Sequence, residues 1–279
     1  MLPGYAPFLA AIVAYPDDDL QKLIYADWLE EQGDADRAEF IRLHIEKVRT
    51  NEKRFYPRPM TARATELRKS HEGQWRAELP SLPGVTWGRM WDGFVSEAKF
   101  ASPLSLIEHA AVAFAATPIR VVQLSELVPD TVEAICALPQ LGKLYGLRLD
   151  DVSLNPAIWQ TLTTGSWFPH IQHLIVHPNT TPLSPPPASV NLKNLIPRLR
   201  RRQLLRDSSV WQQQERATRQ LWGEQLIRMV IASANHERSR LRLVHLNMPF
   251  IDRELIRSVD FGRLKVTGLE PEDNDFDPL

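Results

Sequence analysis

Apolar residues in the first fifth of the chain recur with the spacing of amphipathic helices. Phe8, Leu9, Ile12 and Val13 fall on one helical face, and a second set follows at Leu20, Leu23, Ile24, Trp28 and Leu29. Pro16 and the Asp17–Asp19 run separate the two, and an aspartate at that point suits a helix N-terminus. Gly33 is the expected C-cap of the second helix, and Asp34 or Asp36 would cap a third. The pattern therefore predicts two or three short helices over residues 5–48, followed by a further helix over about 61–79.

From Phe94 onward the pattern changes, because short β-favouring pieces alternate with helical ones. Phe94–Phe100, Val121–Leu124, Leu147–Leu149 and Leu174–Val176 are the first four β-favouring pieces. Their last apolar residues, Phe100, Leu124, Leu149 and Val176, lie 24, 25 and 27 residues apart. This spacing is typical of leucine-rich repeats, whose period is about 20–29 residues. Helices are expected between the strands at about 103–116, 129–138 and 155–163.

The regular spacing is interrupted after Val176, since the next strand anchor, Leu246, comes 70 residues later. Residues 178–190 are rich in proline and indicate a stiff loop. Residues 191–235 have a helical pattern with a concentration of arginine. One more strand–helix–strand unit is expected at about 241–269, and the acidic residues 270–279 have the composition of a disordered tail.

The first stretch also resembles a known family. The sequence Leu23-Ile24-Tyr25-Ala26-Asp27-Trp28-Leu29-Glu30-Glu31, with Arg37-Ala38-Glu39-Phe40-Ile41-Arg42-Leu43 after it, is similar to the bacterial repeat-companion domain of planctomycetes and myxobacteria. The resemblance covers residues 5–48. It implies an architecture, a small helical module in front of leucine-rich-type repeats, and it brings no catalytic activity with it.

Together these patterns predict an α/β fold, an irregular leucine-rich-repeat-like solenoid with an all-helical N-terminal module and a helical insertion. The expected divisions are a repeat-companion-like module at 1–55, a helical linker at 56–83, a leucine-rich-like domain at 84–269 and an acidic tail at 270–279. Within the third division, the proline-rich loop and the basic helical insertion occupy about 178–240.

Composition narrows the possible functions without naming one. The 279 residues are 43% apolar and 24% charged, with a formal net charge of −1, so no overall charge draws the chain to nucleic acid or to a membrane. Cys136 is the single cysteine, which excludes a disulfide and a cysteine-based zinc site. The sequence has neither a signal-peptide pattern nor an apolar run of the roughly 20 residues that span a bilayer. A cytoplasmic protein without a membrane partner is the expectation.

The strongest candidate for partner binding is the basic part of the insertion. Arg198, Arg200, Arg201, Arg202 and Arg206 lie within nine residues, and Trp211 follows them. Such a cluster can bind an acidic protein surface or nucleic-acid phosphates, or it can form a plain solvated helix face. No helix-turn-helix, zinc-finger or RNA-recognition pattern accompanies it. Protein binding is therefore the first hypothesis, and nucleic-acid binding is the alternative.

No group of residues in the sequence forms a recognisable catalytic or metal site. On a strand, His173 and His177 would point to the same side and His170 to the other, which does not suit a three-ligand metal site. The acidic residues Asp17–Asp19 are better explained as helix caps than as a cation site. No nucleophile elbow, phosphate-binding loop or dinucleotide fingerprint is present. The sequence thus favours a non-enzymatic adaptor, scaffold or regulatory subunit without cofactor or metal, whose partner is another protein, for example an enzyme encoded beside the same gene.

Overall fold

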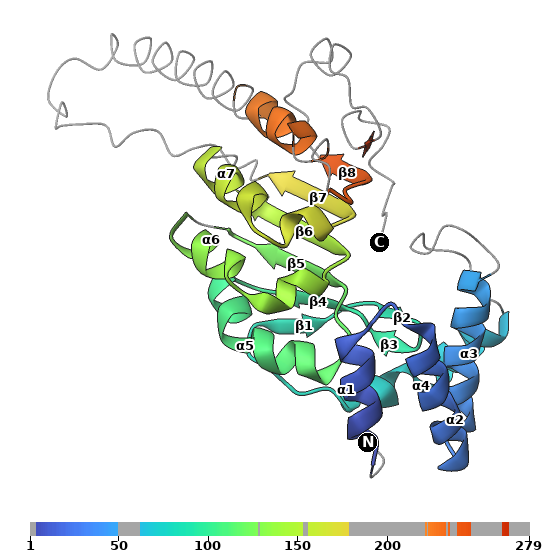
Figure 1. The fold of residues 1–279 in the computed structure, drawn as a ribbon. Coiled ribbons are helices and arrows are strands. Elements are labelled where there is room, and N and C mark those ends of the chain that lie inside the picture. Colours follow the sequence, from blue (N-terminus) through green and yellow to red (C-terminus); the bar gives the residue numbers. More distant parts are fainter. Residues whose placement is uncertain are drawn as a thin grey trace, which may run out of the picture.

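The computed structural model describes residues 4–49, 62–127, 129–152, 156–178, 221, 223–232, 234, 239–246 and 264–267. These residues form a mixed α/β fold in which a mostly parallel sheet is flanked by helices (Figure 1). Among the described residues, no helix combines the length and apolarity required to cross a bilayer.

Four helices precede the sheet and lie at one end of it (Figure 1). They are α1 (Ala6–Ala14), α2 (Asp19–Glu31), α3 (Ala35–Arg49) and α4 (Ala62–Ala77). Asp18 caps α2, since its Oδ1 accepts a hydrogen bond from the Leu20 amide at 2.9 Å, and Asp34 accepts one from the Arg37 amide at 3.2 Å. Gly33 follows α2 with φ +88°, a conformation that glycine adopts without strain. The predicted helices of this region and the N-caps are confirmed, whereas the C-cap of α2 is Gln32 and the predicted Gly33 is the residue after it.

Seven strands form the main sheet in the order β1-β4-β5-β6-β7-β8-β9. Their bounds are β1 (Val85–Trp87), β4 (Glu97–Phe100), β5 (Val121–Ser125), β6 (Gly146–Val152), β7 (His173–Pro178), β8 (Leu243–Leu246) and β9 (Lys265–Thr267). Strand β1 pairs antiparallel with β4, and every later pair is parallel. From β4 onward, each strand in the chain therefore lies beside the one before it.

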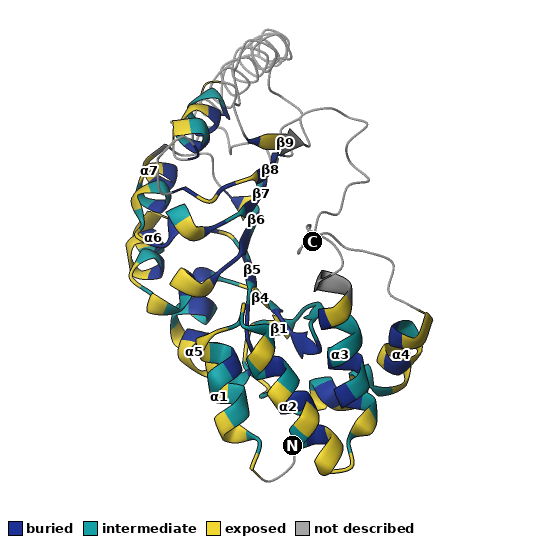
Figure 2. Cartoon of the chain, turned by 45° about the vertical axis from the view of Figure 1, so that its right-hand side comes forward, coloured by how far each residue is buried: buried dark blue, intermediate teal, exposed yellow. Residues whose placement is uncertain are grey.

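The apolar anchors that set the sequence spacing lie side by side in this sheet. Phe100 pairs with Leu124, Leu124 with Leu149, Leu149 with Val176, and Val176 with Leu246. Between the strands lie α5 (Pro103–Ala116), α6 (Pro129–Cys136), the 3-10 helix η1 (Pro139–Lys143), α7 (Pro156–Thr164) and the 3-10 helix η2 (Phe168–His170). These helices, with the helical residues 223–232, lie along one face of the sheet (Figures 1 and 2). The anchors point to that face and belong to the largest apolar core of the described residues.

Two features of the sheet region differ from the sequence prediction. The expected single piece Phe94–Phe100 is divided into β3 (Phe94–Val95) and β4, and β3 pairs with β2 (Met90–Trp91) in a separate hairpin. The division falls at Ser96, whose amide donates to the Arg89 carbonyl of the hairpin while its carbonyl accepts from the Arg120 and Val121 amides. The antiparallel strand β1 was not predicted, since three residues give too short a periodic signal.

The hairpin connects the helical module to the sheet. Phe94 is buried in the same apolar cluster as Ile12, Tyr25 and Ile41 of helices α1 to α3. Gly93 lies against Ile41 with φ +85°, and a side chain there would collide with Ile41. The core of the N-terminal module is therefore completed by a residue from outside residues 1–55.

Candidate recognition surface

One face of the parallel sheet is lined by helices, and the other carries alternate residues of the same strands. Side chains alternate between faces along a strand, so the partners of the core anchors point away from the helices. We call the surface formed by these residues the open face; it comprises Glu97, Lys99, Val121, Gln123, Ser125, Gly146, Arg148, Asp150, His173, Ile175, His177, Leu243, His245 and Lys265. In Figure 2, no described helix lies against this face beside β5 to β8.

Asp150 is the centre of a polar cluster on the open face. Its Oδ1 accepts hydrogen bonds from His177 Nδ1 at 2.8 Å and from Arg148 Nε at 3.2 Å, and its Oδ2 accepts one from Gln123 Nε2. Partial burial alone would raise the pKa of Asp150, but the bonds from His177, Gln123 and Arg148 outweigh it and lower the pKa to about 2. Asp150 is therefore a fixed carboxylate that orients its neighbours, and it cannot serve as a general acid at neutral pH.

His177 extends this cluster across the sheet. Its ring meets that of His245 edge to face, with 5.7 Å between the ring centroids. The side chains of Arg148 and His177 are 27% and 29% exposed, so both are accessible to a binding partner. The cluster thus offers guanidinium and imidazole groups held in place by one shared carboxylate.

His173 is the second perturbed group of the open face. It is buried, and Tyr145 lies against it with 2.7 Å between the Tyr145 hydroxyl and His173 Nε2. Burial lowers the pKa of His173 to about 4, so the ring is neutral at physiological pH. A buried neutral histidine beside a tyrosine serves packing and hydrogen bonding.

Two buried apolar side chains lie between the polar residues of the open face. Val121 of β5 and Ile175 of β7 are each 1% exposed and form one apolar cluster, and Gly146 of β6 is the register partner of Val121. Gly146 lies 3.4 Å from the Val121 side chain when a Cβ is placed on it, so a larger residue would crowd this contact. Gly146 thus leaves room for the side chains of Val121 and His173, which flank it in the sheet.

Charged contacts fix the helical module to the sheet beside this surface. Lys22 of α2 is 4% exposed and donates to Asp92 of the hairpin at 2.5 Å. Arg120 reaches Asp17 with both contacts near 3 Å, and Lys143 donates to the Val13 carbonyl at 3.1 Å. Burial lowers the pKa of Arg120, although Asp17 counteracts the shift. The Asp17–Asp19 run thus provides a helix cap and an inter-element ion pair.

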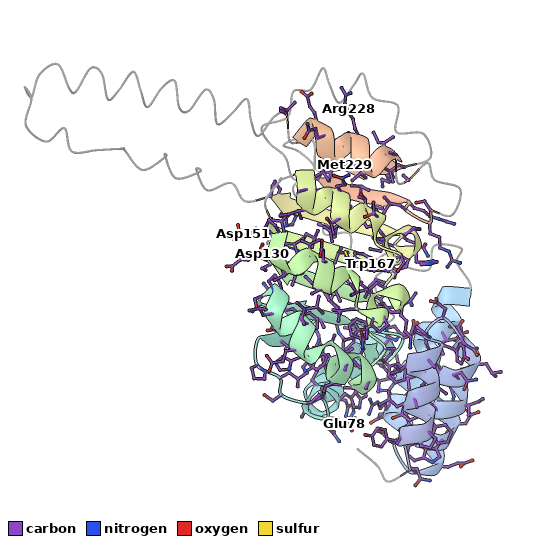
Figure 3. The ribbon with its side chains drawn as sticks, turned by 60° about the vertical axis from the view of Figure 1, so that its left-hand side comes forward. Glu78, Asp130, Asp151, Trp167, Arg228 and Met229 are labelled. Atoms are coloured by element: carbon purple, nitrogen blue, oxygen red, sulfur yellow. The ribbon has the colours of Figure 1, made fainter. Side chains whose placement is uncertain are left out.

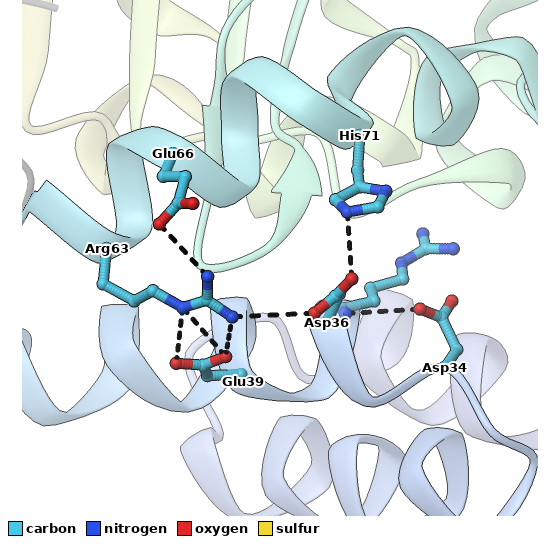
Figure 4. A network of polar contacts seen from close by, with 7 residues as sticks. Asp34, Asp36, Glu39, Arg63, Glu66 and His71 are labelled. Atoms are coloured by element: carbon cyan, nitrogen blue, oxygen red, sulfur yellow. Dashed lines mark hydrogen bonds and ion pairs between the residues drawn. The ribbon is translucent and has the colours of Figure 1, made fainter.

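A second charged network is exposed and joins α3 to α4 (Figure 4). Arg63 binds Glu39 through its Nη2 at 2.7 Å and Glu66 at 3.1 Å, and His71 Nε2 lies 3.0 Å from Asp36. Hydrogen bonds from Arg63 lower the pKa of Glu39, and those to Glu39 and Glu66 raise the pKa of Arg63. These contacts link α3 to α4. Because their side chains are exposed to solvent, they form no enclosed site.

The candidate site residues from the sequence lie in different parts of the chain, and the structure describes only some of them. Arg198, Arg200, Arg201, Arg202, Arg206 and Trp211 lie outside the described residues, as does the acidic tail. His173 and His177 share one face of β7 as predicted, whereas His170 belongs to the 3-10 helix η2. In the part of the chain that the structure describes, no three histidine, cysteine, aspartate or glutamate residues are grouped as for a metal ion. Cys136 is partly buried, and burial raises the pKa of its thiol to about 11.

The Asp150 cluster was not found from the sequence. Its members come from three strands, and only the register that pairs Gln123 with Arg148 and Asp150 with His177 brings them together. The one available signal was the alternation of Arg148 and Asp150 with Leu147 and Leu149, which predicts that both polar residues share a face.

Comparison with known proteins gives no match to any family model, curated protein or solved structure.

Proposed function

We propose that this chain is a non-enzymatic protein-recognition module whose contact surface is the open face. The observation that carries the proposal is the arrangement of β4 to β9, parallel and sequential, with helices against one face and a mixture of polar and apolar side chains on the other. A surface of this kind offers a partner many separate side chains on a rigid support.

Two further observations support a repeated unit, and with it the proposed leucine-rich-repeat-like solenoid. The apolar anchors Phe100, Leu124, Leu149 and Val176 are adjacent in register. Glu126 and Asp151 follow paired positions of β5 and β6, and both have a positive φ, +58° and +56°. The same uncommon backbone turn at the same place in successive units is expected where one structural unit is repeated. The four N-terminal helices would then be the repeat-companion-like module that the sequence resembles.

The shifted pKa values of Asp150, His173 and Cys136 agree with a binding role. Asp150 is held ionised by three donors, and burial keeps His173 neutral and Cys136 protonated. None of the three has the pKa near neutrality that a general acid–base residue requires. We therefore propose an adaptor, scaffold or regulatory subunit, with a protein as its partner.

The proposal is tested by affinity purification of the tagged chain from the cells that produce it, with surface variants compared side by side. Lys99→Glu with Ser125→Arg changes the open face, and Glu108→Lys on α5, whose side chain is 75% exposed, is the matched change on the helix side. The account expects one stoichiometric partner with the wild-type chain and with Glu108→Lys, and its loss with the open-face variant. Recovery of the same partner in equal amount by the open-face variant would contradict the assignment of the surface.

A second candidate function is nucleic-acid binding, which the five arginines within Arg198–Arg206 favour. The test is a gel shift with generic single- and double-stranded probes over a range of salt concentrations. Binding by phosphate contacts must weaken steeply as salt rises. The lack of any shift at low salt would remove this candidate.

A further inference from the structure

A small cavity lies where the helical module meets the hairpin and the segment before β5. Its wall comprises Pro16, Asp17, Lys22, Trp91, Asp92, Phe94, Ser96, Pro118 and Arg120. The volume of the cavity is about 20 Å³, above the roughly 10–15 Å³ that a cavity needs to hold one water molecule. The side chain of Asp17 is 58% exposed, so the cavity is open to solvent on this side. There is therefore room for one small polar group that enters from the surface.

The charged residues of the wall are already paired with one another. Asp92 Oδ2 binds Lys22 Nζ at 2.5 Å, and Arg120 Nη2 binds the two Asp17 oxygens at 2.9 and 3.0 Å. Lys22 Nζ also lies 3.7 Å from Asp19. Each cation of the wall thus has a carboxylate beside it, and each carboxylate has a cation. A charged ligand would lose its hydration without gaining a free opposite charge, so the cavity favours a neutral ligand.

One donor and one acceptor of these ion pairs lack a hydrogen bond. Arg120 Nε and Asp92 Oδ1 are buried, and neither has a partner among the residues that the structure describes. The Arg120 guanidinium is otherwise engaged, since its Nη1 donates to the Lys143 carbonyl at 2.5 Å. Burial lowers the pKa of Arg120, and the charges of Asp17 and Asp92 counteract the shift, so the Asp92 carboxylate acts on this guanidinium. Because an unpaired buried polar atom is unfavourable, a ligand that pairs with both atoms would be stabilised.

We propose that this cavity binds a primary carboxamide, whose carbonyl oxygen accepts a hydrogen bond from Arg120 Nε and whose NH₂ group donates one to Asp92 Oδ1. A carboxamide is neutral and carries both an acceptor and donors on one flat group. The rings of Trp91 and Phe94 belong to the same wall and suit its carbon stem. Such a group occurs in asparagine and glutamine side chains and in small free amides. The site is separate from the open face and does not depend on the function proposed for that face.

An NMR titration of the full-length chain with three small molecules tests the proposal. Propionamide carries the carboxamide, butanone keeps its shape and its acceptor without an N–H donor, and propionate is charged. The reporter is the ¹H–¹⁵N signal of Arg120 Nε, which is identified by its loss in the Arg120→Lys variant. We expect a saturable shift with propionamide and binding at least about tenfold weaker with butanone, since Asp92 Oδ1 then stays unpaired. Propionate should also bind more weakly, because its charge is unmatched.

Two results of this titration would overturn the proposal. The first is the lack of a saturable shift with propionamide, which would mean that the cavity admits water only. The second is equal binding of propionamide and butanone, which would mean that Asp92 Oδ1 makes no hydrogen bond to the ligand.

A pair of variants tests the donor. Arg120→Lys keeps a positive charge beside Asp17 but has no Nε, so propionamide should no longer shift the indole N–H signal of Trp91. Arg228→Lys is the matched control, since Arg228 is exposed at the other end of the molecule (Figure 3), and it should keep the shift. Wild-type affinity in Arg120→Lys would overturn the assignment of the donor. If Arg120→Lys does not fold, the comparison of propionamide with butanone at the Trp91 signal of the wild-type chain decides the proposal.

Two tripeptides distinguish the sources of the carboxamide. Tighter binding of Gly-Gln-Gly than of propionamide would identify a side chain of a partner protein as the ligand, whereas equal binding of the two would identify a small free amide. Gly-Glu-Gly replaces the carboxamide by a carboxylate and should not bind. Equal affinity for Gly-Glu-Gly and Gly-Gln-Gly would overturn the preference for a neutral group.

Discussion

The helical module and the parallel sheet are stabilised in different ways, although they are in contact. The sheet has one continuous core, in which anchors from each strand lie beside those of the next, against α5 to α7. The module instead has two small apolar clusters, one of which is completed by Phe94 of the hairpin. It adds buried charges to them, including Lys22 with Asp92 and Arg37 with Glu78 at 2.7 Å. A sheet of this kind depends on periodic apolar positions, whereas the module depends on individual contacts with residues far away in the sequence.

The largest expected effect is the loss of an anchor from the sheet core. Phe100 is fully buried in β4, and Phe100→Ala should lower the free energy of unfolding by about 3–5 kcal/mol, since it removes a large apolar group and leaves a cavity. Urea-induced unfolding measures the loss. Leu104→Ala on α5, where the side chain is 67% exposed, is the control and should cost less than about 0.5 kcal/mol. A similar cost for both variants would contradict the single core.

The second effect concerns the charge pair between the module and the hairpin. Lys22→Met should cost about 2–4 kcal/mol, because it leaves the Asp92 carboxylate without its buried partner. Asp92 has φ +48°, a conformation that asparagine tolerates well, so Asp92→Asn is the matched change on the other side.

A double-mutant cycle gives the coupling between these two residues. The chain that carries both changes should recover part of the loss, since position 92 is then uncharged and only the 3.7 Å contact of Lys22 with Asp19 remains lost. Strictly additive costs would mean that the contact does not hold the module to the hairpin.

The lowered pKa of His173 predicts that the stability of the folded chain depends on pH. Its pKa is lowered to about 4 in the folded chain, against about 6.5 when unfolded. Between these values the unfolded chain binds more protons, so stability should rise from pH 4 to pH 6.5, by up to about 3 kcal/mol. Unfolding midpoints in urea across this range give the measurement.

The His173→Gln variant separates this contribution from others. The rise between pH 4 and pH 6.5 should become smaller in this variant. Asp150 does not interfere, because its lowered pKa of about 2 stabilises the fold fully above the usual aspartate pKa, and that contribution is lost only as the pH falls below about 4. An unchanged pH profile in His173→Gln would show that another group is responsible.

The smallest effect is expected for the exposed network between α3 and α4. Arg63→Ala removes contacts to Glu39 and Glu66 that are open to solvent, so the thermal midpoint should fall only slightly at low salt. At about 1 M salt, where the screening length is about 3 Å, the difference from the wild-type chain should disappear. A large, salt-independent loss would mean that this network, and not the buried clusters, holds the module together.

The parts of the fold that could be predicted are those determined by local pattern. The period of the apolar anchors predicted β4 to β7 and the helices between them, and Asp18, Gly33 and Asp34 marked the ends of helices in the module. The position of Phe94 was predicted less well, because its environment comes from α1 to α3, some 50 residues or more earlier in the chain. The Asp150 cluster was missed for a similar reason, since the pairing of three strands creates it. The arginine-rich candidates remain a prediction.

Side-chain footprinting of the partner complex by hydroxyl radicals tests the central claim most directly. The two faces of the sheet region offer separate reporters, with Gln123, Arg148 and His177 on the open face and the exposed Leu104 and Val112 on α5. The account predicts that the partner protects the open-face reporters and leaves Leu104 and Val112 as reactive as in the isolated chain. Protection of Leu104 and Val112 with unchanged reactivity at Arg148 and His177 would contradict it.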